Sequence, residues 1–207
     1  MRPGSYYRSL VARQLGICPG DGWTLDLGAG DGRVLNALGG SRTVALDRVP
    51  TPDAQVPFVR GDLAAAPFPD GAFQTILALD LLEHLDPDCL LAPEIARLAA
   101  PGATVWLSVP TRDFRLFPHF LTSPVHRAWG HRRPGYTRRE LSAVAPASDI
   151  YEWNEPAYRA CYILIRIVAW LAAPLARAII QWAFLYDMRH RSGNRGHYFA
   201  RYVVSRR

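Results

Sequence analysis

Short apolar runs alternate with segments of helical spacing through the first half of the chain. Five of the runs have the length and composition of β-strands, and they lie at 23–27, 43–46, 58–59, 73–79 and 104–109. The run at 73–79 is almost wholly apolar, as expected of a strand that is buried on both faces. Helical spacing separates the strands at 33–38 and 89–100, the latter closed by a Pro-Gly turn. This β-α-β alternation predicts a doubly wound α/β domain with a mostly parallel sheet and right-handed crossovers.

The second half of the chain has a different pattern. Residues 110–136 contain four prolines and several aromatic side chains, and we expect them to form a long ordered loop on the substrate side of the sheet. The remaining predicted elements are a helix within 1–16, a helix at 137–145, and strands at 150–153 and 197–205. The helix at 137–145 is predicted to begin with a capping box of Thr137 and Glu140. The length of the chain fits one domain that comprises residues 1–207.

A long apolar helical region precedes the last predicted strand, as an insertion at 155–190 that Pro174 would kink or split. At 100° per residue, Arg159, Arg166 and Arg177 fall within about 20° of one another, so a narrow polar stripe runs beside a wide apolar surface. That surface carries Ile163, Leu164, Ile167, Trp170, Leu171, Ile179, Ile180 and Phe184. The arginines interrupt the roughly 20 apolar residues that a transmembrane helix needs. The surface could lie in a membrane interface, form a dimer contact or pack against the domain.

Charge is distributed unevenly along the chain. All 24 basic residues are arginine, and the formal net charge is +6. Residues 1–109 carry a formal −4 and residues 110–207 a formal +10. A basic half can meet nucleic acid, an anionic membrane or an acidic substrate. No nucleic-acid-binding motif accompanies the charge, so we expect no nucleic-acid partner.

The cysteines and the first residues of the chain bear on its compartment. Cys18, Cys89 and Cys161 form no CxxC pair and no metal-binding spacing, so they predict a reducing cytoplasm and no metal site. The residues after Met1 lack the apolar core of a secretory signal. We therefore expect a cytoplasmic protein, with the apolar insertion allowing peripheral contact with the inner face of the membrane.

The segment LDLGAGDGR carries the clearest chemical signal. A strand enters a glycine turn and a helix leaves it, an arrangement in which glycines permit positive φ and the helix N-terminus offers free N–H donors. Asp47 ends the next strand, where a carboxylate can bind both hydroxyls of a ribose, and Asp62 ends the third, where it can accept from an adenine amino group. Nicotinamide-binding proteins use a similar turn, but Arg33 replaces the third glycine of their fingerprint.

In these motifs the chain resembles the class I S-adenosylmethionine-dependent methyltransferases, specifically the small-molecule and lipid branch. DLGAGDGR matches the first motif of that family, ALD the second, and VRGDL the acid on the adenine side. PFPDGAFQ followed by ALDLLEHL matches the fourth-strand region, and PGATVWLSVP matches the fifth. The resemblance covers about residues 20–110 and the final strand. It implies a seven-stranded Rossmann-like sheet, S-adenosylmethionine as the cofactor, and methyl transfer as the reaction.

The resemblance also implies which residues bind the cofactor. Asp26, Gly28 and Gly30 would surround its methionine part, and Asp47 would hold the ribose. Judged from the residues alone, Asp47 could instead cap a turn.

The adenine and the methyl group have their own implied contacts. Asp62 and Leu63 would contact the adenine, and Asp80, after the fourth strand, would line the mouth through which the methyl group is transferred. Asp62 could instead form an Asx turn, and Asp80 could cap the short helix that contains Glu83 and His84.

Three histidines are candidate general bases or substrate contacts. Transfer from a sulfonium needs mainly alignment, but an oxygen or nitrogen acceptor must also lose its proton, and histidine is the usual base. His131 is the first choice, followed by His126, and both lie in the predicted loop at the carboxyl edge of the sheet. His84 lies in LLEHL, where the family often has a histidine. Each could instead be a structural histidine bonded to the backbone.

The leading functional hypothesis is methyl transfer to a hydrophobic or lipid-like small molecule at a membrane surface. One alternative is a methyltransferase for a soluble metabolite, with the apolar helices forming a homodimer interface. A second is an RNA methyltransferase, suggested by the basic half of the chain, and a third is a cofactor-binding scaffold without catalysis. The identity of the acceptor atom does not follow from a fold that serves oxygen, nitrogen and carbon acceptors alike.

Overall fold

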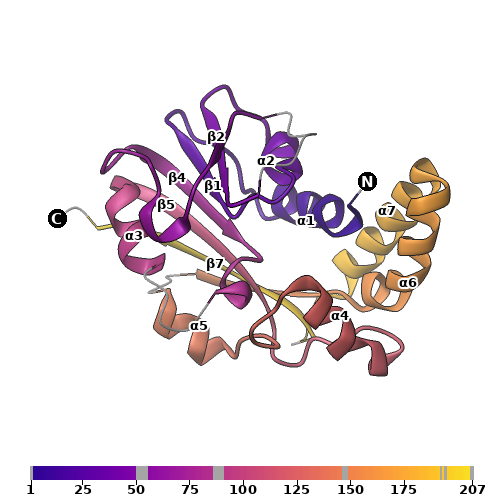
Figure 1. The fold of residues 1–207 in the computed structure, drawn as a ribbon. Helices are drawn as coiled ribbons and strands as arrows, with labels where there is room; N and C mark the ends of the chain where they lie inside the picture. The colour runs from indigo at the N-terminus through magenta and orange to yellow at the C-terminus, as the bar shows by residue number, and fades with distance from the viewer. Residues whose placement is uncertain are drawn as a thin grey trace.

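A seven-stranded sheet with helices on both faces forms the body of the protein (Figure 1). The computed structural model describes residues 2–49, 56–85, 91–145, 149–191, 193 and 195–205. The strands are β1 (Thr24–Leu27), β2 (Thr43–Asp47), β3 (Phe58–Arg60), β4 (Phe73–Leu79), β5 (Ala99–Pro110), β6 (Asp149–Asn154) and β7 (Gly196–Val203). Their order is β3-β2-β1-β4-β5-β7-β6, with β1 to β5 parallel and β7 antiparallel to both of its neighbours. The predicted doubly wound, mostly parallel sheet is confirmed.

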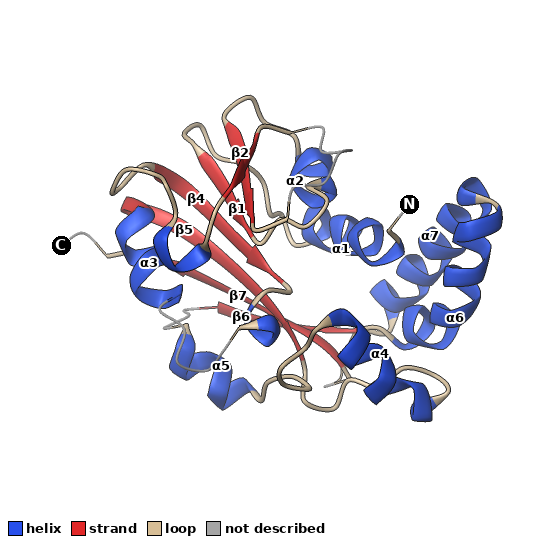
Figure 2. Cartoon of the chain, viewed as in Figure 1, coloured by secondary structure: helices blue, strands red, loops and turns tan. Residues whose placement is uncertain are grey.

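Helices cover both faces of this sheet (Figure 2), and a hydrophobic core lies on each face. The helices are α1 (Pro3–Gln14), α2 (Arg33–Leu38), α3 (Leu91–Leu98), α4 (Thr122–Trp129), α5 (Arg138–Val144), α6 (Pro156–Leu171) and α7 (Ala173–Arg189), with short 3-10 turns η1 (Leu63–Ala65), η2 (Leu82–His84) and η3 (His119–Leu121). One core joins the sheet to α3 and α5, and the other joins it to α1, α2, α6 and α7. Ile76 and Leu77, adjacent in β4, belong to different cores because successive strand residues point to opposite faces.

The first half of the fold differs from the sequence prediction mainly at the start of β5. The predicted helix at 89–100 ends at Leu98, because Ala99 already pairs with Phe73 of β4. The Pro-Gly pair at 101–102 therefore lies within β5, near a shift in register, rather than closing the helix. Residues 89 and 90 of the predicted helix lie outside the described residues.

The long ordered loop predicted at 110–136 is wrong in one respect, since that segment contains η3 and α4. Pro124 is the third residue of α4, where its missing N–H interrupts no helical hydrogen bond. Gly130 ends the helix with φ +80. The next helix, α5, begins with the predicted capping box of Thr137 and Glu140.

The apolar insertion forms two packed helices, α6 and α7, that are separated at Ala172, with Pro174 in the first turn of α7. The split that Pro174 predicted is confirmed, but the continuous polar stripe is not. Arg159 is 9% exposed and donates to the carbonyl oxygens of Glu155 and Arg115, whereas Arg177 is exposed on the other helix. Among the described residues, no helix has the length and hydropathy needed to cross a membrane.

Only part of the predicted apolar surface of the insertion is exposed. Ile180 is fully buried, and Ile163, Ile179 and Phe184 pack against the core on the α1 side. Intramolecular packing therefore accounts for one side of the helix pair. The other side carries large exposed apolar side chains and is considered below.

Candidate functional site

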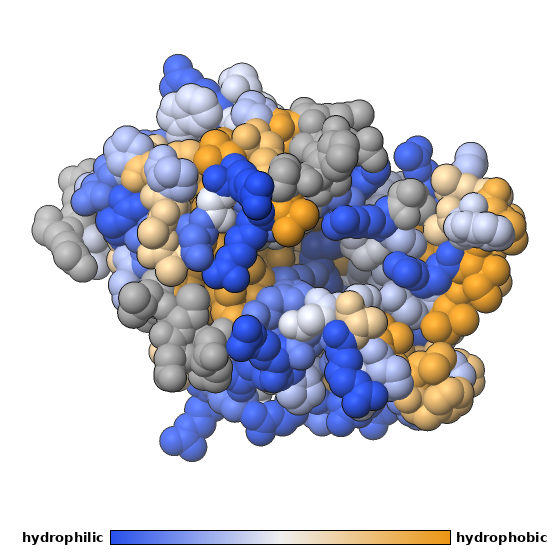
Figure 3. Space-filling view, in the orientation of Figure 1, coloured by the Kyte–Doolittle hydropathy of each residue, from blue (hydrophilic) through white to orange (hydrophobic). Residues whose placement is uncertain are grey.

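The order of the strands places a candidate ligand site at the carboxyl ends of β1 and β4. β1 lies between β2 and β4, so the chain leaves β1 toward β2 and β3 on one side and later returns to β4 and β5 on the other. Open α/β sheets bind ligands at such a switch point. Gly28 directly follows β1 and Asp80 directly follows β4. In Figure 3 the molecular surface is hollowed near the centre of the view, beside these strand ends.

The turn after β1 has the backbone conformation that its glycines allow. Gly28 and Gly30 have φ of +69° and +57°. A Cβ atom on Gly28 would lie 2.5 Å from the end of the Leu81 side chain, so a larger residue there would also force Leu81 to move. Among the described residues, the Arg2 side chain, at 3.7 Å, would be the nearest neighbour of a Cβ atom on Gly30. The backbone at Gly30 is therefore open to a ligand.

Asp47, at the end of β2, is tied to this turn. Its Oδ2 accepts a hydrogen bond from the Gly30 amide at 2.8 Å, and its Oδ1 accepts from the Val49 amide at 3.2 Å. Asp47 thus does cap its own turn, as the alternative interpretation held. A carboxylate has about four acceptor positions, so two remain for the hydroxyl groups of a ribose.

The interior of the turn is acidic. Asp26 in β1 and Asp31 in the turn are both buried. Burial, and then the charges of Asp47 and Asp31, raise the pKa of Asp26 to about 8. A cation bound here would relieve this accumulation of negative charge.

The residues predicted to contact adenine lie at the end of β3. Asp62 is exposed, its carboxylate pairs with Arg48 at 3.0 Å, and it accepts from the Ala64 amide to form the start of η1. Leu63 is buried in the core on the α3 side. The Asx-type turn is therefore present, and the adenine contact of both residues stays a prediction.

Asp80 has a strained backbone and several polar contacts. Its φ is +52°, a value that residues other than glycine rarely adopt. Its carboxylate accepts from Arg8 at 2.8 Å and from Ser108 at 2.6 Å. Burial alone would raise its pKa, but the nearby Arg8, His197 and Ser108 hold the pKa of Asp80 below its ordinary value. The alternative that Asp80 caps η2 is not supported, since the residue at that position is Leu81 and no side chain caps it.

A buried polar network that the sequence did not reveal supports Asp80. Arg8 of α1 also lies 3.2 Å from Glu155, and His197 of β7 lies 2.7 Å from the same carboxylate. Burial tends to raise the pKa of Glu155, yet His197 and Arg8 lower it overall. No motif in the sequence joins these residues, because they come from the first helix, a loop and the last strand.

The three candidate histidines lie together in the structure, although His84 is far from the other two in the sequence. The ring of His131 is 4.7 Å from that of His84 and 4.7 Å from that of His126, measured between centroids. Burial lowers the pKa of His126, and burial with the neighbouring histidines lowers that of His131 to about 3. Among the described residues, the buried His126 Nε2 and His131 Nδ1 have no hydrogen-bond partner. A lowered pKa favours the neutral ring in His126 and His131. Their two unpartnered nitrogens are not bonded to the backbone as those of structural histidines would be.

Comparison with known proteins identifies the family. Residues 2–198 match the family model for a methyltransferase domain. The chain belongs to the methyltransferase domain family. One curated methyltransferase, the ajmaline N-methyltransferase of Rauvolfia serpentina, is 40% identical over 53 residues, which are 26% of this chain and 18% of that protein. The chain thus matches under a fifth of the length of this curated relative.

Solved structures of methyltransferases share the fold. An S-adenosylmethionine-dependent methyltransferase from Archaeoglobus fulgidus superposes with a TM-score of 0.64 at 16% identity, covering 96% of this chain and 94% of the other. Phosphoethanolamine N-methyltransferase 2 from Haemonchus contortus, in complex with S-adenosyl-L-methionine, superposes with a TM-score of 0.63 at 15% identity, covering 96% of this chain and 52% of the other. The expected class, an S-adenosylmethionine-dependent methyltransferase domain, is confirmed.

The residues of this methyltransferase domain fit S-adenosylmethionine. The acidic interior around Asp26 suits a cofactor that carries an ammonium and a sulfonium group, and the open backbone at Gly30 allows a close approach. Asp47 retains acceptor capacity for the ribose. When bound, the cofactor supplies an activated methyl group. The individual residue assignments remain predictions.

Proposed function

We propose that this methyltransferase domain methylates a hydrophobic, lipid-like small molecule, which it meets at an anionic membrane surface. The observation that carries the proposal is the exposed apolar face of α6 and α7. This apolar face consists of side chains that are each more than half exposed: Leu164, Ile167, Trp170, Leu171, Leu175, Trp182 and Leu185. Trp170 is 85% exposed. Figure 3 places hydrophobic residues over α6 and α7 on the viewed side.

The chemistry of the apolar face suits the boundary between lipid and water. A contiguous exposed surface of large apolar side chains usually marks an interaction site. Arg166 and Arg177 are exposed on the same two helices, where their long side chains can reach anionic head groups while the apolar side chains enter the lipid. Trp182 and Tyr186 stack with ring centroids 5.9 Å apart, and such rings favour the membrane interface.

Aromatic contacts connect α6 with the histidine cluster. Tyr162 of α6 packs edge-on against Trp129 at 5.5 Å, and Trp129 lies 5.3 Å from the ring of His131. Aromatic packing thus runs from the buried Tyr162 of α6, a helix that carries part of the apolar face, to the edge of the site. This continuity supports an acceptor taken from the membrane.

The location follows from the same proposal. We place the protein in the cytoplasm, bound peripherally to the inner face of the membrane. A second copy of the chain could cover the apolar face instead, and the acceptor would then be a soluble metabolite. That alternative is an outcome of the following test.

Vesicle flotation with Trp170→Glu tests the proposal. The wild-type protein is expected to float with vesicles that contain anionic phospholipid. Trp170→Glu should weaken binding by at least about tenfold, because burying one large apolar side chain contributes roughly 1.5–3 kcal/mol. Trp23→Glu is the matched control, since Trp23 is 47% exposed and precedes β1, outside the apolar face. Transfer of labelled methyl groups from S-adenosylmethionine into a lipid extract is the matching activity readout.

Two outcomes would contradict the proposal. The first is a wild-type protein that does not bind the vesicles and forms a dimer that Trp170→Glu dissociates. This result would favour the soluble-metabolite alternative. Cofactor binding without methyl transfer to lipid or soluble acceptors would favour a non-catalytic scaffold.

A further inference from the structure

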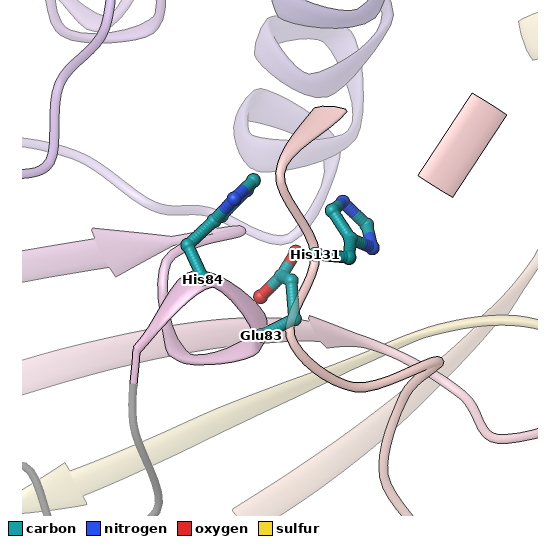
Figure 4. A group of neighbouring side chains, drawn as sticks. All are labelled: Glu83, His84 and His131. Carbon is teal, nitrogen blue, oxygen red and sulfur yellow. The ribbon is translucent and has the colours of Figure 1, made fainter. Parts of the chain in front are cut away.

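We infer that Glu83, His84 and His131 form a divalent-cation site beside Asp80, with coordination positions left open for water or an oxygen of the acceptor. Each of the three residues offers one ligand atom, and these atoms all lie within 4.8 Å of one another. In Figure 4 the carboxylate of Glu83 lies between the rings of the two histidines. The spacing of residues in the sequence gave no indication of this site.

The distances are close to those of a coordinated set. An ion about 2.1 Å from each nitrogen or oxygen ligand holds those ligands roughly 3–4 Å apart. Shifts of under about 1 Å, within the reach of side-chain rotation, would complete the set. The backbone already holds the parts together, because the Arg132 amide donates to the Glu83 carbonyl at 2.8 Å and the His131 amide donates to the His126 carbonyl at 3.0 Å.

Buried atoms without partners mark the same place independently. Glu83 is only 1% exposed, and its Oε2 has no hydrogen-bond partner among the described residues. Within the same described part of the chain, the buried Nδ1 of His131 also has none. A buried carboxylate oxygen and a buried imidazole nitrogen each cost free energy when nothing binds them. A cation between them would satisfy both atoms.

The donor set indicates the kind of ion. Two imidazoles and one carboxylate, with a position left open, are the ligands of one class of catalytic zinc sites. Imidazole ligands also suit the neighbouring divalent transition metals. Zn²⁺ is therefore the appropriate probe.

Calorimetric titration of chelator-treated protein with Zn²⁺ alone tests the site without cofactor or acceptor. One saturable site per chain is expected. Glu83→Gln and His131→Asn should each weaken binding by at least about 100-fold, since loss of even an outer-shell partner costs 10–100-fold. His190→Asn should bind as the wild type does, because His190 is exposed just after α7 and its Nδ1 lies 2.9 Å from the Tyr186 carbonyl oxygen.

Two results would overturn the inference. One is Zn²⁺ binding by the wild type that is as weak as that of Glu83→Gln and His131→Asn. The other is Zn²⁺ binding by both variants that is as tight as that of the wild type. If circular dichroism shows that Glu83→Gln is unfolded, His84→Asn replaces it, because His84 is only half-buried. S-adenosylhomocysteine binding is measured in the same samples, so that failure of the metal inference is distinguished from failure of the cofactor site. Protein that binds S-adenosylhomocysteine but not Zn²⁺ contradicts only the metal inference.

Discussion

Arg8 Nε donates a hydrogen bond to Asp80 Oδ2 at 2.8 Å, and this bond links α1 to the turn that follows β4. The Nη1 atom of the same guanidinium lies 3.2 Å from Glu155 Oε1. Arg8 is 6% exposed and Glu155 is fully buried. One buried cation therefore bridges two carboxylates that are far apart in the sequence, and the N-terminal helix holds Asp80 in its strained position.

Replacement of Arg8 by methionine is expected to lower the free energy of unfolding by about 3–5 kcal/mol. This is the usual cost of removing one partner of a buried ion pair, because the remaining charge is left uncompensated. Urea denaturation followed by circular dichroism measures the loss. Arg48→Met is the matched control, since Arg48 and Asp62 form an exposed pair at 3.0 Å that solvent screens, so its loss should change the free energy of unfolding far less. Equal losses for the two variants would contradict this account of the network.

The sequence predicted the elements whose pattern is local. The seven strands were predicted from apolar runs, and α5 begins at the capping box predicted from Thr137 and Glu140. The prediction failed where long-range pairing decided the outcome. Ala99 joins β5 because Phe73 lies beside it, and Arg159 is buried because the carbonyl of Arg115 is available to it. Neither partner is visible in a local pattern.

The same distinction applies to the site. The positions of Gly28 and Gly30 after β1, and of Asp47 at the end of β2, were predictable because a known motif places them there, while their contacts with the cofactor stay predictions. Their direct contact, a hydrogen bond from the Gly30 amide to Asp47, could not be predicted from spacing. The histidines were identified only as separate candidates, and α4 brings two of them together with His84. Glu83 was missed because a buried acid without a partner is recognised only when its neighbours are known.

Gly30→Ala should weaken S-adenosylhomocysteine binding by at least about tenfold, because the added methyl group would occupy the open space beside the backbone. Positive φ should also cost about 1–2 kcal/mol of stability. Gly16→Ala separates the two effects, since Gly16 has φ +72 and a Cβ atom there would meet no atom of the described residues within 4 Å. That variant should lose similar stability while keeping its affinity. If both variants bind the nucleoside normally, the turn does not contact it.

Asp47→Ala should weaken S-adenosylhomocysteine binding by about 1.5–3 kcal/mol, or roughly 10- to 150-fold, through loss of charge-assisted hydrogen bonds to the ribose. Isothermal titration calorimetry measures the change. Asp149→Ala is the control, because Asp149 is a half-exposed carboxylate that pairs with Arg201 at 3.6 Å, away from the glycine turn. Affinity unchanged in Asp47→Ala would remove the ribose assignment.

The affinity for S-adenosylhomocysteine should rise between pH 6 and pH 8, by up to about tenfold per pH unit. The pKa of Asp26 in the free protein is raised to about 8, by burial and by the charges of Asp47 and Asp31. The ammonium group of the ligand would lower that pKa, because it stabilises the ionised carboxyl. Binding below pH 8 must then release a proton, and the release becomes easier as the pH rises. Above pH 8 the Asp26 carboxyl of the free protein is already ionised, so the affinity no longer rises with pH on its account.

Asp26→Asn provides the decisive comparison, because an amide cannot titrate while the ligand titrates as it does with the wild type. Calorimetry in two buffers of different ionisation enthalpy measures the protons released on binding. The wild type should release up to about one proton at pH 7, and Asp26→Asn should release fewer and lack the rise in affinity toward pH 8. The same pH dependence in both proteins would mean that Asp26 does not sense the ligand, and that its buried carboxyl serves the fold alone.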